Sequence, residues 1–526
     1  MTHPFRRAAV VGAALLPLVA GAFLVESAHD RSGPRLFDQV VSLVSDRFVD
    51  SVGSAALYEK AARGLVRELQ DPYAALYSPK ELQDFTRMTG GRYGGLGMLV
   101  EDQEGAIVVS KVYPHTPAEA AGVREGDHIV GVETQSTRGW KLTQVTDMLK
   151  GDPGTKVRVS FSRLGVATPI DFSFTRAVIH IPAVPFAMMF SGNVGYIPLQ
   201  QFNETAAGEF EQAVTRLSRE GARGIVIDLR GNGGGIVDQA IAISNLFLRN
   251  GQQIASVRAR GGETQTYVAK GNPLAPTLPL VVLTDGYTAS ASEIVAGALQ
   301  DHDRALLLGT TSFGKGLVQS LFPLDGGWAL KMTTAKWYTP SGRSIQRERK
   351  IVDGRLVVVD EPDSIESDSA RKARPTFKSD GGRTVYGGGG ITPDVVVRPD
   401  TLDSTEQDFV KAVTPKSQEF YVTLYNYAFA LKDKVKPDFA VTPAWREELY
   451  RRLASAGVPV DRSLYDRASS EVDRLLGDRV ARLAFGDSTA KRRELPDDVQ
   501  LERAIDIIRK GETQADLFAT AQPPSR

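Results

Sequence analysis

Two short apolar runs, each leading through a turn of small residues toward a helix, constrain the fold of this chain most strongly. The first is 224–229, followed by the glycine-rich turn 230–235. The second is 280–284, followed by the Thr/Ala/Ser segment 288–292 and a helical pattern over 293–299. Apolar runs rich in β-branched residues and bounded by turn residues indicate buried strands. Because such strands alternate with helices, the sequence predicts an α/β core.

The turn after the second strand is a candidate site of nucleophilic chemistry. Ser290 and Ser292 would stand near a helix N-terminus, where unpaired backbone N–H groups can face a developing negative charge. A serine hydroxyl is a poor nucleophile until a neighbouring base takes its proton. Lys315 follows the next predicted strand in a glycine-flanked loop, and burial can lower the pKa of a lysine toward neutrality. The residues predict a serine–lysine pair, with helix capping by the serines as the alternative.

The glycine-rich turn 230–235 is the second candidate element. Its backbone amides suit an oxyanion or a phosphate, but the turn lacks the lysine and Ser/Thr of a P-loop. Asp228 and Arg230 stand at the strand end. We expect them to hold the turn by charge-assisted hydrogen bonds rather than to act as catalytic charges.

A histidine base is the alternative mechanism. His302 stands beside Asp301, which allows a Ser-His-Asp arrangement, and the chain has six histidines. The surrounding segment is Asp-His-Asp-Arg, so we expect His302 to be solvated at the surface and not to be the base.

Composition narrows the classes of function. A chain of 526 residues should hold three or four domains. Its 63 basic and 63 acidic residues balance, so no nucleic-acid partner is indicated. The absence of cysteine excludes thiolate metal sites, disulfides and a cysteine nucleophile. The proposed chemistry needs no metal and no organic cofactor.

The N-terminus suggests export. Arg6 and Arg7 precede the uncharged stretch 8–25, a pattern typical of a signal peptide or a membrane anchor. We therefore expect residues 1–30 to direct the chain to the periplasm, with 6–25 as an inner-membrane anchor if they are retained. Residues 31–89 carry helical periodicity and are expected to be an N-terminal helical region.

Two motifs together resemble the active-site signature of the C-terminal processing (tail-specific) proteases, peptidase family S41. They are Thr288-Ala-Ser-Ala-Ser-Glu293 and Phe313-Gly-Lys-Gly-Leu-Val-Gln319. In that family the nucleophile is the middle serine and the general base is the lysine 25 positions later. The resemblance thus implies Ser290 as nucleophile, Lys315 as base and Gln319 as the residue that orients the lysine.

The same resemblance extends to the rest of the core, residues 177–400, for which it implies a crotonase/Clp-peptidase-like α/β fold. The turn 230–235 would form the oxyanion hole, with one N–H from Gly233 or Gly234 and the other from Ala291. Asp301 occupies a position where some members of the family carry an acidic residue, and we expect a supporting role. The polar segment 360–382 is expected to be a mobile loop.

Residues 90–176 resemble an inserted, β-rich PDZ domain. Segment 91–98 is similar to the carboxylate-binding loop, and 116–130 matches the helix-turn-strand signature of that domain. A peptide tail would add as an extra strand. The alternative is a PDZ domain kept only for dimer packing or internal docking. The residues expected to bind the tail are Gly95, Leu96, Gly97 and Met98 in the loop, and Val145, Met148 and Leu149 along the groove.

The family motifs end near Val397, and residues 401–526 are predicted to form a helical C-terminal domain. Dimerisation, partner docking and a stabilising cap all remain open for it. The resemblance, added to the serine–lysine pattern, implies a serine endopeptidase that cuts proteins near C-terminal tails, which the PDZ domain would recognise. Expected partners are protein or peptide substrates with free C-terminal tails, an adaptor protein, and a second copy through the helical regions. The competing class is a non-catalytic PDZ scaffold on an inactive protease core.

Overall fold

The computed structural model describes residues 32–521, except 104, 164, 353–354, 359–370 and 372. The predicted signal peptide or anchor, residues 1–30, lies outside the described residues. Within the described ranges, none of the helices combines the length and the apolar character that a bilayer span requires. Contacts divide the chain into two units, one of residues 1–79 with 319–333 and one of residues 80–318 with 334–526.

The first unit is built on two helices, α2 (Ser32–Arg47) and α3 (Ser54–Glu68), which contact each other. After them, β1 (Ala75–Tyr77) pairs antiparallel with residues 329–331 of β18 (Ala329–Tyr338). Both helices carry apolar side chains on one face, yet no residue of α3 is buried. The first unit therefore presents apolar helix surface to its surroundings.

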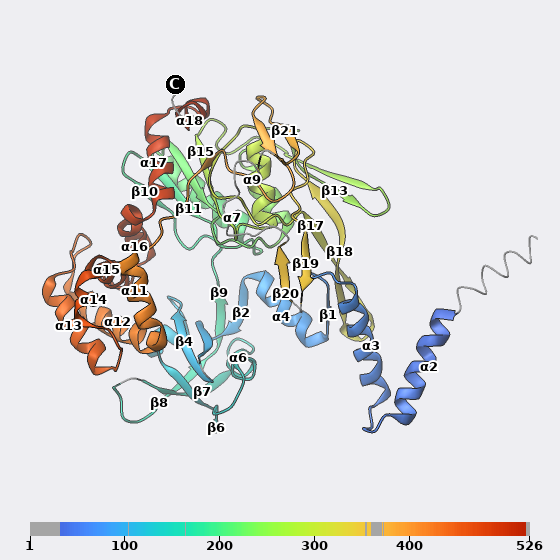
Figure 1. The fold of residues 1–526 in the computed structure, drawn as a ribbon, viewed down its shortest axis with the longest axis horizontal. Helices are drawn as coiled ribbons and strands as arrows, with labels where there is room; N and C mark the ends of the chain where they lie inside the picture. Colours follow the sequence, from blue (N-terminus) through green and yellow to red (C-terminus); the bar gives the residue numbers. More distant parts are fainter. Residues whose placement is uncertain are drawn as a thin grey trace, which may run out of the picture. The chain divides into compact units, whose positions relative to one another are not determined.

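The second unit contains a six-stranded sheet that carries the candidate site (Figure 1). Only β10 is antiparallel to its neighbour. In register, Asp228 at the end of β12 lies beside Leu283 near the end of β15. Because parallel strands end at the same edge of a sheet, the turns after β12 and β15 meet there. The strands, in spatial order, are β10 (Met188–Phe190), β11 (Val194–Pro198), β12 (Gly224–Asp228), β15 (Leu280–Thr284), β16 (Leu306–Gly309) and β23 (Val395–Val396).

One face of this sheet is covered by three helices, the last of which contains the helical pattern predicted over 293–299. They are α7 (Ala206–Arg219), α8 (Val237–Asn245) and α9 (Ala291–Asp301). Alternate strand residues, among them Ile227 and Val282, pack against them in one buried core. A sheet buried on both faces explains why the strands are apolar along their whole length rather than alternating. The predicted α/β core is confirmed.

The opposite face is covered from far along the chain, by α17 (Val499–Lys510) and α18 (Gln514–Ala521). Leu501 and Ile508 of α17 are fully buried against strand residues such as Val226 and Val281. Figure 1 shows α17, in red, beside β10, β11 and β15. The predicted helical domain 401–526 is therefore not one unit, because its last two helices complete the core of the sheet.

The rest of the C-terminal region forms a helical bundle with its own core. Its principal helices are α11 (Ser404–Val413), α12 (Ser417–Leu431), α13 (Pro443–Ser455), α15 (Ser469–Phe485) and α16 (Asp487–Glu494). The bundle contacts the predicted PDZ region through an ion pair between Arg479 and Glu125. A cation–π contact of 4.4 Å between Arg124 and Phe429 lies at the same place.

The predicted PDZ region is a sheet of order β3-β4-β5-β7-β8 around a separate apolar core. Its inner and far strands are β4 (Ala106–Val112), β5 (His128–Val132), β7 (Lys156–Ser162) and β8 (Ile170–Thr175). Strand β3 (Met98–Gln103) lies at its edge, near α6 (Leu142–Leu149). A short pair of β2 (Arg92–Gly95) with β9 (Ala177–His180) joins the two ends of the region. An edge strand beside a helix is the arrangement that strand addition by a peptide requires.

The expectation of a loop over 360–382 is wrong for part of the described residues. Thr376–Lys378 (β21) pairs antiparallel with Thr384–Tyr386 (β22). Two contacts fix this hairpin to the core: the Asp380 N–H donates to the Asp301 carbonyl at 2.8 Å, and Arg383 pairs with Asp303 at 2.5 Å. A polar composition did not reveal these contacts because their partners lie about 80 residues earlier.

Candidate active site

Ser290 stands at the junction between β15 and α9 in a strained conformation. Its φ is 57° and its ψ is −114°, a combination that a residue with a side chain rarely adopts. Ala289 and Ala291 on either side are buried, whereas Ser290 is partly exposed. The sharp turn therefore leaves Ser290 partly accessible to solvent, although the residues on both sides of it are buried.

The other serine of the motif is committed to structure. Ser292 is fully buried, and its hydroxyl donates to the carbonyl oxygen of Asn232 at 3.0 Å. This bond ties the first turn of α9 to the glycine-rich turn. Of the two serines, Ser290 is the one in a position to meet a substrate.

A buried carboxylate, that of Glu293, joins the Ser290 junction to the lysine loop. Its Oε2 accepts the backbone N–H of Ser290 and the backbone N–H of Lys315, each at 2.8 Å. The Ser290 and Lys315 backbone nitrogens thus share one acceptor atom. The distance between them cannot exceed the sum of the two hydrogen-bond lengths. The structure in this way brings the main chains of the two predicted catalytic residues together.

The second oxygen of Glu293 holds the same loop. Oε1 accepts the Ser312 hydroxyl at 2.5 Å and the Gly314 N–H at 2.6 Å. The side chain is 0% exposed. Burial raises the pKa of Glu293, and its four donors oppose that shift. A carboxylate without solvent needs such donors, because an unpaired buried charge is very costly.

The glycine-rich turn is bound directly to the segment before Ser290. The Ala289 N–H donates to the Asn232 carbonyl at 3.0 Å, and the Thr288 hydroxyl donates to the Leu229 carbonyl at 2.9 Å. Gly234 has a φ of +94°, and a methyl group there would lie 2.6 Å from the Ala289 oxygen. Only glycine permits both the backbone angle and this close approach.

Two backbone amides remain available beside Ser290. The Gly234 N–H is used, since it donates to Asn232 Oδ1 at 2.9 Å. In the part of the chain that the structure describes, neither the Gly233 N–H nor the Ala291 N–H has an acceptor. Of the two glycines predicted as alternatives, Gly233 is therefore the one with a donor to offer.

Asp228 and Arg230 form the base of the turn. Arg230 binds Asp228 through two bonds of 2.9 and 2.7 Å, and the Arg230 N–H also donates to Asp228 at 3.0 Å. Tyr196 donates its hydroxyl to the same carboxylate at 2.8 Å, and burial followed by Asp228 raises the pKa of that phenol. The guanidinium also binds Asp498, a residue that sequence analysis did not single out.

Asp301 and His302 lie at the opposite end of α9 from Ser290. At 1.5 Å per residue, the eleven residues of the helix separate the two ends by about 16 Å. Asp301 is buried and binds Arg343 at 2.7 Å and the Ser341 N–H at 2.9 Å. Asp301 therefore holds Arg343 and the Ser341 backbone at a distance from the nucleophile candidate.

The expectation that His302 is solvated is wrong. Its side chain is 7% exposed, with Nδ1 2.7 Å from Asp380 and Nε2 donating to the Gln253 carbonyl at 2.7 Å. Its place at the far end of α9 separates it from Ser290, which gives no support to a Ser-His-Asp arrangement.

Gln319 belongs to the other contact unit. It lies in β17 (Leu317–Pro323), where its side-chain amide donates to the Thr333 hydroxyl at 3.2 Å.

The residues predicted to form a PDZ groove are mostly part of that region's core. Leu96, Met98, Val145 and Leu149 are all buried, and Val145 has no exposed surface, while Met148 is partly exposed. Gly95 is buried at the end of β2, and Gly97 has a φ of +83° with its backbone against Thr116. Within the described residues, the Leu96 and Gly97 amides have no acceptor.

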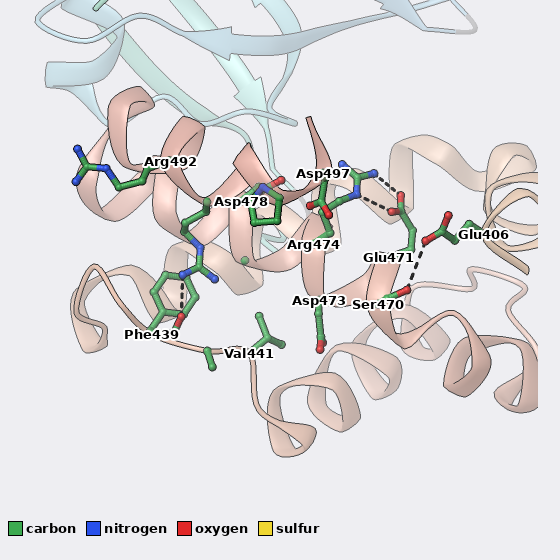
Figure 2. A pocket seen from close by; sticks show the side chains of 14 residues that line it. Glu406, Phe439, Val441, Ser470, Glu471, Asp473, Arg474, Asp478, Arg492 and Asp497 are labelled. Carbon is green, nitrogen blue, oxygen red and sulfur yellow. Dashed lines mark hydrogen bonds and ion pairs between the residues drawn. The ribbon is translucent and has the colours of Figure 1, made fainter. Parts of the chain in front are cut away.

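A cavity of about 490 Å³ lies away from these residues, among helices of the C-terminal bundle (Figure 2). Its lining is charged, and two of the charged residues pair with each other: Arg474 binds Glu471 through two bonds of 2.7 and 2.6 Å. Figure 2 also shows Ser470 directed at Glu406. Ligand pockets are mostly apolar, and we assign this cavity no catalytic role. Among the described side chains, no group of His, Asp and Glu has the arrangement of a metal site.

Sequence reasoning missed three residues of the site, and one of them had a local signal. Glu293 stands three positions after Ser290, the spacing of a capping box, but its bonds to the loop at 312–315 have no local signal. The other two residues have no local signal in the sequence: they are Asn232, which joins the two turns, and Asp498.

Comparisons with known proteins agree with these observations. The model of peptidase family S41 matches residues 193–353, and that of the PDZ domain matches 108–163. A carboxy-terminal-processing protease of Bartonella bacilliformis is 36% identical over 314 residues, which cover 59% of this chain and 72% of that protein. Carboxy-terminal processing protease CtpA of Bacillus subtilis is 33% identical over 344 residues, 65% of this chain and 73% of that protein.

Among solved structures, that of the photosystem II D1 C-terminal processing protease is 30% identical. The match covers 62% of this chain and 90% of that chain, with a TM-score of 0.37.

Replacing Glu293 by glutamine should loosen the site. An amide has one accepting oxygen, so its NH2 group would face two of the four donors. We expect Glu293→Gln to lower the free energy of unfolding by about 2–4 kcal/mol and to speed hydrogen exchange at the Ser290 and Lys315 amides. The exposed Glu211 gives a matched control, for which Glu→Gln should change stability by less than about 0.5 kcal/mol. Equal melting and equal exchange in both variants would contradict the assigned contacts.

Proposed function

The chain belongs to the carboxy-terminal processing proteases of peptidase family S41 and is a serine-type peptidase acting on proteins, and we propose that Ser290 is its nucleophile and Lys315 its general base. The family, the α/β fold with a PDZ domain and the class of enzyme were each predicted from the sequence and are confirmed. The observation that carries the proposal is the shared acceptor: one oxygen of Glu293 binds the backbone amides of both residues.

The proposed reaction follows from these positions. A neutral Lys315 amine takes the proton of the Ser290 hydroxyl as the oxygen attacks the scissile carbonyl carbon. The resulting lysine ammonium gives that proton to the leaving amine, and an acyl-serine remains. Lys315 then takes a proton from a water molecule as the water oxygen attacks the ester carbon. When the second tetrahedral intermediate collapses, the C–O bond to Ser290 breaks, the lysine ammonium returns its proton to the Ser290 oxygen, and the new C-terminal carboxylic acid is released. Gln319 is proposed to orient the lysine.

The tetrahedral intermediates carry a negative oxygen, which we place at the Ala291 and Gly233 amides. Both N–H groups lack an acceptor among the described residues, and the first follows the nucleophile directly. Such donors act mainly on the transition state, and the loss of one typically reduces kcat by on the order of 10²–10³. The Asn232 bond to Gly234 supports the choice of Gly233 as the second donor.

Three variants test the dyad and separate it from the alternatives. Ser290→Ala and Lys315→Ala should each lower the cleavage of an unfolded protein by about 10³-fold or more, because the two residues act as one unit. His302→Ala is the control and should keep kcat within about threefold. The rate of casein cleavage at equal concentrations of folded enzyme is the measurement. Full activity of Lys315→Ala would reject the dyad, activity lost only in His302→Ala would favour the histidine base, and an inactive wild-type protein would favour the scaffold.

We propose further that the PDZ domain binds the substrate's C-terminal carboxylate. The Leu96 and Gly97 amides, without acceptors in the described part of the chain, support the site of binding. The edge position of β3 supports addition of the tail as a strand. Val145 and Leu149 are buried, whereas Met148 is partly exposed. Among these three side chains of α6, we therefore expect Met148 to make most of the contact with the substrate tail.

Blocking the substrate's terminus tests this recognition. A peptide substrate with a C-terminal amide should be cleaved with a KM at least about tenfold higher than the same peptide with a free carboxylate, because the amide lacks the charge that the loop binds. The cut site and sequence stay identical, so the comparison isolates the terminus. Equal KM values for the two peptides would contradict tail recognition by the domain.

We also propose that α2 and α3 mediate pairing with a second copy of the chain. Leu36, Val40 and Leu43 of α2 follow the i, i+4, i+7 spacing of a helix–helix seam, and are 63%, 50% and 61% exposed. In α3, Leu65 is 68% exposed. Isolated apolar residues at a surface are ordinary, but a continuous stripe of them indicates an interaction site.

Mass photometry across a dilution series tests the pairing. The wild-type chain should be a dimer at micromolar concentration, and the double variant Leu36→Glu, Leu43→Glu should be a monomer, since charges would be buried in the seam. Leu402→Glu, at an exposed leucine outside these helices, is the control and should leave the dimer intact. A monomeric wild-type chain, or a dimer in the double variant, would reject this surface. Export to the periplasm and an adaptor protein stay predictions from the sequence.

A further inference from the structure

Arg230, at the base of the glycine-rich turn, is held from two directions. Asp228 binds the edge of the guanidinium formed by Nε and one terminal nitrogen, at 2.9 and 2.7 Å. Asp498 binds the other edge through two bonds of 2.8 Å. Gln500 adds a bond of 3.0 Å. Two carboxylates on both edges of a planar cation fix its position and its plane.

The three charged groups are largely removed from solvent. Arg230 is 19% exposed, Asp228 9% and Asp498 13%. Burial opposes the charge of Asp498, but Arg230 and Lys491 outweigh it and lower the pKa of this carboxyl. Removing one partner from such a buried cluster leaves an uncompensated charge, which is costly.

Asp498 is itself anchored. Its Oδ1 accepts the Leu501 N–H at 3.0 Å at the start of α17, and its Oδ2 accepts the Lys491 ammonium at 2.8 Å. Leu501 and Ile508 bury α17 in the core of the sheet. The carboxylate therefore stands at a fixed place relative to β12 and β15, although it lies 268 residues after Arg230.

The geometry points to a role for Asp498 in catalysis: we propose that it is a positioning residue, which through Arg230 holds the turn 230–235 so that the Gly233 amide faces the oxyanion. Asp228 fixes the arginine to the strand, and Asp498 fixes the remaining edge from α17. The C-terminal segment would then be part of the catalytic apparatus, although it lies beyond the residues that the family model matches. This inference rests on the proposed oxyanion hole.

The proposal predicts a particular kinetic signature. A misplaced oxyanion donor stabilises the transition state less and leaves the binding of the substrate in its ground state unchanged. We therefore expect kcat to fall while KM stays constant. A loss of general stability would instead reduce the amount of folded enzyme. A displacement of about 1 Å in a catalytic group can cost as much as 10²-fold in rate.

Asp498→Asn in the full-length chain is the test. Asparagine is as good an N-cap as aspartate, so the start of α17 is preserved while the charge that binds Arg230 is lost. We expect kcat for peptide cleavage to fall about tenfold or more, with KM within about twofold of wild type. Asp506→Asn is the matched control, because Asp506 lies in the same helix and binds only Arg503 and Lys510 among the described residues. It should leave both constants unchanged.

Two companion variants make each result decisive. Asp498→Glu keeps the charge and should recover at least part of the lost kcat; a glutamate variant as slow as the asparagine variant overturns the proposal. A kcat of Asp498→Asn equal to that of the wild type also overturns the proposal. A change in the KM of Asp498→Asn as large as the change in its kcat overturns it as well. Ser290→Ala separates this inference from the dyad: if it is inactive while Asp498→Asn is unimpaired, only the positioning role fails. If Ser290→Ala still cleaves, the proposed nucleophile fails first. Melting curves confirm that each variant is folded at the assay temperature.

Discussion

The candidate site depends on one buried carboxylate. Glu293 receives four donors, two from the lysine loop backbone, one from Ser312 and one from the Ser290 amide. A charge without access to water must be satisfied by fixed donors, so the segments that supply them cannot move independently. The strained backbone of Ser290 is maintained by the same bonds. Conformational strain, burial and the meeting of two distant segments thus have one physical cause.

Parallel strand order explains why these segments can meet at all. β12 and β15 are neighbours in register, so the glycine-rich turn and the Ser290 junction leave the same edge of the sheet. The Asn232 carbonyl then joins them, because it accepts the Ala289 N–H and the Ser292 hydroxyl, while the Asn232 side chain accepts the Gly234 N–H within its own turn. The glycine-rich turn is held in addition by Asp498, which binds Arg230. Residues 498–521 therefore cover one face of the sheet and also contact the base of the glycine-rich turn.

Much of the core was predictable because its signals are local. The apolar run 280–284 is β15 itself, and the run 224–229 differs from β12 by one residue. Helix α9 follows the serine motif as its periodicity indicated. The exposure of His302 was mispredicted because a charged tetrapeptide does not reveal that Asp380 and Gln253 enclose the ring. The split of residues 401–526 was missed for a similar reason, since helical periodicity shows that a face is apolar and not which surface covers it.

The sequence alone determined the buried strands β12 and β15, helix α9, the family and the pair of residues proposed for catalysis, because each is encoded in short motifs or in periodicity along the chain. Only the tertiary structure decided which serine is accessible, which amides remain without acceptors, and that Glu293 and Asp498 hold the site. Those properties are pairings between groups separated by up to 268 residues. Burial makes such pairings obligatory for a charged group, yet the identity of the partner is set by the fold and leaves no trace in neighbouring residues.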